Sequence, residues 1–366
     1  MTVAYTADRI FTGEEWINDH AILVGNDKIT DIVTLSSLPS SGEIQSFKNN
    51  FIAPAFIDLQ LYGASGRLLS VYPEANSLKK LTEHCEKGGT AFCLPTVATN
   101  SYEVFYKCID AVKDYWNQKG TGVLGLHLEG PWINPVKRGA HIESLIHSPN
   151  LQQAKDLLEY GKGIIKMITL APEVCDKEII DLVLSYGIII SAGHSNATYE
   201  QAKMGFANGI TTVTHLYNAM SPLQHREPGL VGATMDDVHV MASIIPDGYH
   251  VDIAAVRIAK AVMKERLFVI TDAVTDTTEG HYQHEQVGDK YEAAGILSGS
   301  ALTMQMALKN LVEKAGMELD EALRMCSLYP ARVVKLETEL GRIAVGYRSP
   351  LVVLNEELNV VSLLRP

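Results

Sequence analysis

The 366-residue sequence contains no long apolar run and no cluster of basic residues. A membrane-spanning helix needs about 20 consecutive apolar residues, so we expect no membrane association. The formal net charge is -12, and an acidic chain without Lys/Arg-rich runs argues against nucleic acid as a partner. Asp8 and Arg9 lie where a secretory signal peptide needs a continuous apolar stretch.

Paired cysteines are also missing. The five cysteines are scattered along the chain, and none forms a C-x-x-C pair. An odd, unpaired set argues against a disulfide framework and against a cysteine metal site. We therefore expect free thiols and a cytoplasmic location. The five are Cys85, Cys93, Cys108, Cys175 and Cys326.

The middle of the chain alternates apolar runs with helical stretches. No G-x-G-x-x-G follows the first run, which removes the main support for a doubly wound dinucleotide-binding sheet. Eight β-α units predict an α/β fold of the (β/α)8 TIM-type barrel class, and an open doubly wound sheet is the structural alternative. The eight runs are Phe51–Leu61, Thr90–Pro95, Val123–Glu129, Ile164–Leu170, Ile188–Ala192, Ile210–His215, His239–Ile245 and Leu267–Thr271.

Helices are expected between these runs, for example at Tyr102–Gln118, Lys177–Tyr186 and Asp252–Lys264. Ser101, followed by Glu103, is a suitable N-cap for the first of them.

Both ends of the chain are rich in short β-strand patterns around turns. We therefore expect one small β-sandwich domain built from both termini. Its boundaries would be residues 1–51 and 343–366, and residues 52–342 would form the barrel domain.

Four residues of metal and acid/base chemistry stand at the ends of four predicted strands: Glu129, His194, His215 and Asp272. In a barrel these strand ends meet at one mouth. One carboxylate and two imidazoles form a common catalytic zinc set that leaves a position for water. Asp272 would then be a free carboxylate for general acid/base work. A single strand-end histidine is more often structural, but four such residues on four strands favour an active site.

Three further histidines are assigned less direct roles. Strand alternation places His127 on the face of Glu129 but two residues deeper, so we expect packing or support of a ligand, with ligation the minority alternative. His281 and His284 follow the eighth strand near Glu279-Gly280, and we expect them to be exposed lid residues.

Short motifs in the same order along almost the whole chain resemble those of the N-acetylglucosamine-6-phosphate deacetylase family, a branch of the amidohydrolase superfamily. The resemblance implies a (β/α)8 barrel with a β-sandwich from both termini. The motifs are His127-Leu-Glu-Gly-Pro131, Ala192-Gly-His-Ser-Asn-Ala-Thr198, Thr214-His-Leu-Tyr-Asn-Ala-Met220, Arg226-Glu-Pro-Gly229, Asp247-Gly-Tyr-His250, Thr271-Asp-Ala273, Leu297-Ser-Gly-Ser300 and Leu328-Tyr-Pro-Ala-Arg332.

The resemblance implies that Glu129, His194 and His215 are the metal ligands. It makes Asp272 the catalytic acid/base, and it places His141 near the acetamido carbonyl of the substrate. The reaction it implies is hydrolysis of N-acetylglucosamine 6-phosphate to glucosamine 6-phosphate and acetate.

Four other positions match residues that hold the 6-phosphate. His250 and Arg226 match charged or imidazole contacts, and the resemblance implies that Arg226 comes from a neighbouring subunit of a homodimer. Asn218 and Ala219 would add side-chain and backbone contacts. A guanidinium fork and an imidazole suit a phosphate that carries a charge of about -1.5 to -2.

One departure concerns the end of the first strand, where many amidohydrolases place His-x-His for a second metal. Here Gln60 and Tyr62 take those places, and strand four ends in Thr169–Glu173 without the bridging lysine of other branches. Both facts favour one divalent metal per subunit, expected to be zinc. The sequence assigns no role to Tyr62.

Other readings of the sequence stay open. The substrate could instead be N-acetylgalactosamine 6-phosphate or a cyclic amide. A catalytically silent regulator that binds sugar phosphate is the alternative outside enzymes, and the presence of all three ligands and Asp272 argues against it.

Overall fold

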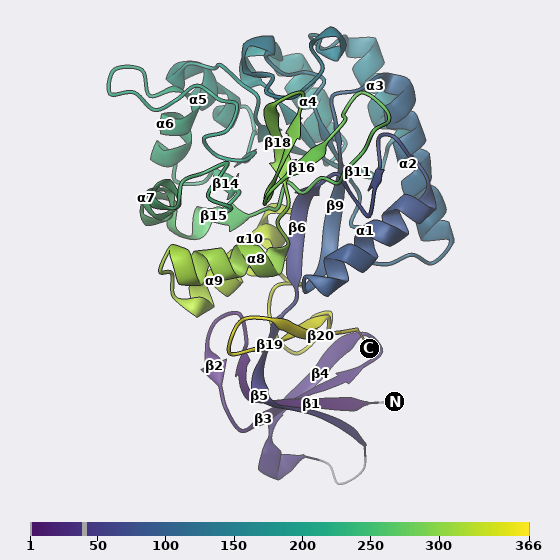
Figure 1. Cartoon of the computed structure of the whole chain (residues 1–366), viewed down its shortest axis with the longest axis vertical. Helices are drawn as coiled ribbons and strands as arrows, with labels where there is room; N and C mark the ends of the chain where they lie inside the picture. Colours follow the sequence, from purple (N-terminus) through teal and green to yellow (C-terminus); the bar gives the residue numbers. More distant parts are fainter. Residues whose placement is uncertain (1, 39–41, 366) are drawn as a thin grey trace. The chain divides into compact units, whose positions relative to one another are not determined.

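A computed structural model describes residues 2–38 and 42–365, and the chain divides into two compact units (Figure 1). One unit consists of Met1–Asp58, Cys85–Phe92 and Thr303–Pro366, and the other of Leu59–His84 and Cys93–Leu302. The domain boundaries expected from the sequence stay a prediction.

The first unit contains a seven-stranded sheet built from both ends of the chain, as expected. Its strands run in the order β20-β19-β5-β1-β3-β4, with β2 on β1. Buried aliphatic side chains such as Ile10, Ile22, Ile52 and Val353 form its core. The strands are β1 (Val3–Phe11), β2 (Trp16–Ile17), β3 (His20–Gly25), β4 (Lys28–Thr34), β5 (Glu43–Pro54), β19 (Leu351–Asn355) and β20 (Val360–Leu364).

The second sheet has eight parallel strands in the order β15-β14-β13-β12-β11-β10-β9-β6. Several of these strands are buried along their whole length, which explains their near-continuous apolar runs. The strands are β6 (Phe56–Leu61), β9 (Thr90–Ala98), β10 (Leu126–Glu129), β11 (Ile165–Leu170), β12 (Ile189–Ala192), β13 (Thr212–Val213), β14 (Met241–Ile244) and β15 (Leu267–Val269).

This sheet closes into a barrel immediately after β15. The Asp272 N–H donates to the Gln60 carbonyl at 2.9 Å, and the Tyr62 N–H donates to the Ala273 carbonyl at 2.8 Å. The closure confirms the predicted barrel and excludes the open doubly wound alternative.

One expected run is divided differently. Phe51–Leu61 was expected as a single strand, but its first residues end β5 in the terminal sheet and the rest form β6. The residues on both sides of the break are apolar and buried, so hydrophobicity alone does not mark the break.

Helices α2–α7 surround the barrel strands (Figure 1). The Ser101 hydroxyl accepts a hydrogen bond from the Val104 N–H at the start of α2, as expected for an N-cap. Within residues 2–38 and 42–365, every helix is too short or too polar to cross a bilayer. The helices of the chain are α1 (Ala75–Lys87), α2 (Tyr102–Asn117), α3 (Leu151–Tyr160), α4 (Lys177–Ser185), α5 (Tyr199–Ala207), α6 (Gly229–Asp236), α7 (Ile253–Met263), α8 (Met304–Lys309), α9 (Leu319–Cys326) and α10 (Leu328–Val333).

A small antiparallel sheet follows the barrel closure and was not expected. It consists of β16 (Glu285–Val287), β17 (Lys290–Ala293) and β18 (Ile296–Ser300).

Candidate active site

A pocket of about 270 Å³ lies at the carboxyl ends of the barrel strands. Nine of the residues singled out in the sequence line it: Tyr62, Glu129, His141, His194, His215, Asn218, Ala219, His250 and Asp272. The described part of the chain does not bring Arg226, Gln60 or His127 into the pocket lining.

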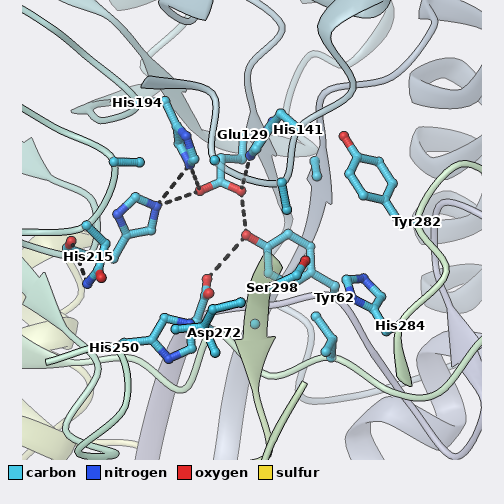
Figure 2. A pocket seen from close by; sticks show the side chains of 18 of the residues that line it. Tyr62, Glu129, His141, His194, His215, His250, Asp272, Tyr282, His284 and Ser298 are labelled. Atoms are coloured by element: carbon cyan, nitrogen blue, oxygen red, sulfur yellow. Dashed lines mark hydrogen bonds and ion pairs between the residues drawn. The ribbon is translucent and has the colours of Figure 1, made fainter. Parts of the chain in front are cut away.

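The Glu129 carboxylate is the centre of the pocket, and three histidines point toward it (Figure 2). Its Oε1 lies 3.1 Å from His215 Nε2 and 3.3 Å from His194 Nε2, and the two Nε2 atoms are 3.1 Å apart. Ligands bonded to zinc at 2.0–2.1 Å in a tetrahedron are separated by about 3.3 Å. These three atoms therefore have the spacing of ligands around one ion.

The His194 ring is oriented as a metal ligand usually is. His194 Nδ1 donates to the Lys137 carbonyl at 3.0 Å, which leaves the Nε2 lone pair facing Glu129. Among the described residues, none hydrogen-bonds His215 Nδ1, and the His215 N–H donates to Ser243 Oγ. Two imidazole nitrogens and a carboxylate oxygen at these distances would repel one another unless a proton or a metal cation lies among them. The donor set therefore fits a divalent metal.

The charges of the pocket follow from burial and from these contacts. Burial alone would raise the pKa of Glu129, but the hydrogen bonds with His141, His194 and His215 outweigh it and hold that pKa well below its usual range. Burial likewise lowers the pKa of His215, and the hydrogen bond and charge of Glu129 reverse this and raise it. Glu129 is therefore ionised.

His141 lies on the other side of the same carboxylate, with its Nε2 3.3 Å from Glu129 Oε2. Its Nδ1 accepts from the Thr99 N–H at 3.3 Å and lies 2.7 Å from Thr99 Oγ1. A neutral ring whose Nδ1 is an acceptor carries its proton on Nε2. Burial and the charge of His194 lower the pKa of His141 to about 4, so it is a neutral donor toward the pocket at pH 7.

Asp272 is fixed through one of its oxygens. Its Oδ1 accepts from Gln60 Nε2 at 2.7 Å and lies 3.2 Å from the Tyr62 hydroxyl. The Tyr62 hydroxyl also hydrogen-bonds Glu129 Oε2, and Gln60 Nε2 lies 2.9 Å from Glu129 Oε1. Burial and the charge of Glu129 raise the pKa of Asp272. Burial and the charge of Asp272 likewise hold the pKa of Tyr62 well above its usual range, so its phenol stays protonated.

Several residues of the pocket have a left-handed backbone. The φ angles are 47° at His194, 36° at His215, 50° at Ala219 and 54° at Asp272. Non-glycine residues rarely adopt this region, and such strain gathers at functional sites.

The expected phosphate contacts are only partly brought together. The buried His250 ring is held by Asp247, whose Oδ2 lies 2.6 Å from Nδ1. Asn218 and Ala219 line the pocket with His250. Arg226 is exposed on the loop before α6.

Two residues support the site from behind it. His127 Nε2 lies 2.7 Å from Thr169 Oγ1, and its Nδ1 lies 3.1 Å from the Leu59 carbonyl. Glu173 accepts from Ser195 Oγ at 2.7 Å and from the Asn196 N–H at 2.6 Å, which anchors the loop that follows His194.

The expectation that His284 is exposed was wrong. His284 and Tyr282 are buried and line the pocket, whereas His281 is exposed as expected. No motif marks Tyr282 or His284, and only the alternation of residues 281–284 in an extended segment hints at two inward-facing side chains.

Comparisons with known proteins agree with this geometry. The sequence profile of the Amidohydrolase family matches residues 51–364, and that of the NagA composite domain matches residues 3–46. The chain is 33% identical to the N-acetylglucosamine-6-phosphate deacetylase of Haemophilus influenzae, over 96% of this chain and 95% of that protein. It is 31% identical to the N-acetylgalactosamine-6-phosphate deacetylase of Escherichia coli O157:H7, over 98% of this chain and 97% of that protein.

A solved structure shares the whole fold. The crystal structure of N-acetylglucosamine-6-phosphate deacetylase from Pasteurella multocida has a TM-score of 0.96 and 33% identity, and the alignment covers 100% of this chain and 98% of that one. With a family profile along most of its length and similar proteins that match it from end to end, this chain belongs to the amidohydrolase family.

Proposed function

We propose that this protein hydrolyses N-acetylglucosamine 6-phosphate to glucosamine 6-phosphate and acetate. The observation that carries the proposal is one pocket that combines a Glu129–His194–His215 cluster with the free carboxylate of Asp272 and the neutral donor His141. The names of the Haemophilus influenzae and Pasteurella multocida proteins support the choice of substrate.

Glu129, His194 and His215 would hold one divalent metal ion, and we propose zinc because imidazole and carboxylate ligands suit it. When bound, such an ion supplies Lewis-acid polarisation of the acetamido carbonyl and acidifies the attacking water. His141 also lies close to Glu129 and could join a ligand set with His194. Its Nε2 carries the proton, however, so we assign it as a donor and not as a ligand.

Asp272 moves the proton. With Oδ1 held by Gln60, its Oδ2 is the oxygen available to take a proton from the attacking water. The same oxygen then returns that proton to the sugar nitrogen as the C–N bond breaks. His141 donates from Nε2 to the carbonyl oxygen as negative charge develops there.

A single metal per subunit is supported by the residues at the end of β6. Gln60 Nε2 lies 2.9 Å from the Tyr62 hydroxyl, and both side chains hydrogen-bond the carboxylates of Glu129 and Asp272. An amide nitrogen and a protonated phenol offer no strong ligand to a second ion. His127, which hydrogen-bonds Thr169, would pack beneath these residues and would not ligate a metal.

The phosphate would lie beside His250, Asn218 and Ala219. Within the described residues, the pocket lining contains no lysine or arginine, although a bound phosphate dianion favours a fixed cation. Arg226 is exposed on its own chain, which fits a role at the pocket of a second copy. We therefore propose a homodimer in which each subunit supplies Arg226 to the other.

Acetate release from pure protein tests the function. We expect turnover of N-acetylglucosamine 6-phosphate and much less of unphosphorylated N-acetylglucosamine. A higher kcat/KM for N-acetylgalactosamine 6-phosphate would favour the second candidate, which rests on the name of the Escherichia coli relative. If neither acetylated sugar phosphate releases acetate, the deacetylase proposal is wrong. The alternative is then a catalytically silent protein that binds sugar phosphate.

We further propose that the enzyme works in the reducing cytoplasm. Within the part of the chain that the structure describes, no disulfide joins any of the five cysteines, and all five are buried, which suits a compartment where thiols stay reduced.

A further inference from the structure

A buried histidine that the proposed reaction does not use lies at one end of the pocket. His284 is 7% exposed and precedes β16, and Figure 2 shows it on the side of Tyr282, away from His194 and His215. His281 and Gln283 are exposed, while Tyr282 and His284 are buried. This alternation is that of an extended segment that turns every second side chain toward the pocket.

The His284 ring has one unsatisfied nitrogen. Nothing in the described residues 2–38 and 42–365 hydrogen-bonds its Nδ1, whereas the Ser298 backbone carbonyl accepts a hydrogen bond from the ring. Burial lowers the pKa of His284 to about 4, so the ring is neutral at pH 7. With the proton on Nε2 for the Ser298 carbonyl, Nδ1 is a bare acceptor.

A buried acceptor without a donor is costly, by about 1–3 kcal/mol. The neighbouring Tyr282 hydroxyl cannot supply this donor. The Tyr282 hydroxyl already donates to the Thr99 carbonyl at 2.7 Å, and its ring stacks on His284 with an interplanar angle of 11°. Leu68, Val274 and Leu297 give the same region an apolar lining. A molecule bound in the pocket can supply the missing donor.

The groups around His284 indicate which kind of donor this end of the pocket can bind. A phosphate or carboxylate only accepts hydrogen bonds when ionised, and a neutral acceptor in an apolar wall would reject it. A hydroxyl both donates and is neutral. The phosphate end at His250 and the acetamido end at Glu129 and His141 are already assigned, so the hydroxyl edge of the sugar is what remains for His284.

We propose that His284 Nδ1 accepts a hydrogen bond from one ring hydroxyl of the amino-sugar phosphate, and that His284 thereby determines which sugars bind. The proposal rests on the proposed deacetylase function. It places a specificity residue on the segment that leads into the β16–β18 sheet, outside the barrel strands that carry the metal and proton chemistry.

The test compares His284→Leu, which removes the acceptor, with His284→Gln, which keeps one. Acetate release is measured with N-acetylglucosamine 6-phosphate and with its 1-deoxy, 3-deoxy and 4-deoxy analogues. We expect His284→Leu to lower kcat/KM for the parent sugar roughly 5- to 100-fold. For one of the three analogues, wild type and His284→Leu should have nearly equal kcat/KM, because that analogue lacks the hydroxyl that His284 contacts. His284→Gln should retain part of the preference for the parent sugar.

The matched control is His281→Leu, the same substitution at an exposed histidine three residues earlier. Its kcat/KM for each of the four compounds should lie within about two-fold of the wild-type value. Equal losses by His284→Leu on the parent and on all three analogues would overturn the hydroxyl contact, as would no loss at all. Failure of the deacetylase proposal is distinguishable, since the wild type would then release no acetate from any of the four compounds. In that case calorimetric binding of the same four compounds to wild type and His284→Leu tests the contact by itself.

Discussion

At the scale of single residues, the two carboxylates of the pocket differ in ways that fit different tasks. Glu129 has three imidazole neighbours, which lower its pKa and keep it ionised. Asp272 has the charge of Glu129 beside it and is buried, and both raise its pKa. A carboxyl group with a raised pKa is a stronger base and takes up a proton more readily, which suits the proton-accepting role proposed for Asp272.

Asp272→Asn should remove nearly all turnover and leave metal binding intact. An amide cannot take or return the proton, and loss of general acid/base catalysis costs about 10²- to 10⁴-fold in kcat. Acetate release and metal content are measured on the same preparation. A variant that keeps more than about a tenth of the wild-type rate would assign the proton to another base, with His141 the first candidate.

The sequence could place these residues at one mouth of the barrel because their positions depend on local pattern. Glu129, His194, His215 and Asp272 each follow an apolar run, and a barrel gathers such strand ends. His284 was predicted wrongly because its burial depends on how an insertion folds over the pocket. The left-handed φ of His194 and His215 could not be predicted either, because non-glycine residues adopt this region only rarely.

At the scale of elements, one ion pair connects α5 with the end of α6. Lys203 Nζ donates to Asp237 Oδ2 at 2.8 Å, and the N–H groups of His239 and Val240 also donate to Asp237. Burial opposes ionisation of Asp237, but these hydrogen bonds outweigh it and lower its pKa to about 2.

Asp237→Asn should therefore destabilise the protein in a pH-dependent way. A carboxyl with a lowered folded-state pKa stabilises the fold above its unfolded pKa of about 3.9 and loses this as pH falls toward 2. After allowance for solvent screening, we expect a loss of about 1 kcal/mol in unfolding free energy at pH 7. Urea unfolding should show the difference narrowing below about pH 4.

The control for this prediction is Glu200→Gln, which removes an exposed carboxylate from α5, the helix that carries Lys203. It should change the unfolding free energy by less than about 0.5 kcal/mol at either pH. A deficit of Asp237→Asn that stays constant with pH would contradict an electrostatic origin.

Strand order and helix positions could be predicted because each barrel element has its own apolar period. The division of Phe51–Leu61 could not, since both sides of the break are buried. β13 shows a similar limit. The run Ile210–His215 was expected as a strand, but only Thr212–Val213 pair as one, and His215 lies in the strained segment beyond it.

At the scale of the whole molecule, the proposed metal couples to stability. The buried Glu129, His194 and His215 atoms face one another, so an ion that binds only the folded chain stabilises it by about 4 kcal/mol at 1,000 times its Kd. We expect one equivalent of metal per chain, and a melting temperature that falls on chelation and recovers when zinc is restored.

His215→Ala should lack this response to chelation, and His239→Ala, at an exposed histidine, should keep it. Two equivalents of metal, both needed for turnover, would contradict the single-metal assignment.

The role proposed for Arg226 would link substrate specificity to the assembly of a dimer. Loss of a hydrogen bond to a charged group costs about 1.5–3 kcal/mol, or roughly 10- to 150-fold. Arg226→Ala should therefore lower kcat/KM for the phosphorylated substrate by that factor and leave kcat/KM for unphosphorylated N-acetylglucosamine almost unchanged. The comparison of kcat/KM for the two sugars measures this.

Subunit exchange tests whether Arg226 acts at the active site of the other subunit in the proposed dimer. When Asp272→Asn and Arg226→Ala chains are mixed, half of the dimers are mixed, and each has one intact site if Arg226 acts in trans. About a quarter of wild-type activity should return. No recovery, with exchange verified by mass, would confine Arg226 to its own chain.

The hydrogen bond that closes the barrel also positions the carboxylate of Asp272, which we propose as the acid/base group. The Asp272 N–H pairs with the Gln60 carbonyl, and the two residues are 212 positions apart in the chain. Contacts of such separation form late, because a long loop must first be ordered. Helices should therefore return early when the unfolded chain is diluted into buffer, while catalysis should wait for this last pairing. The delay between recovery of the helical circular dichroism signal and recovery of acetate release would measure how late the barrel closes.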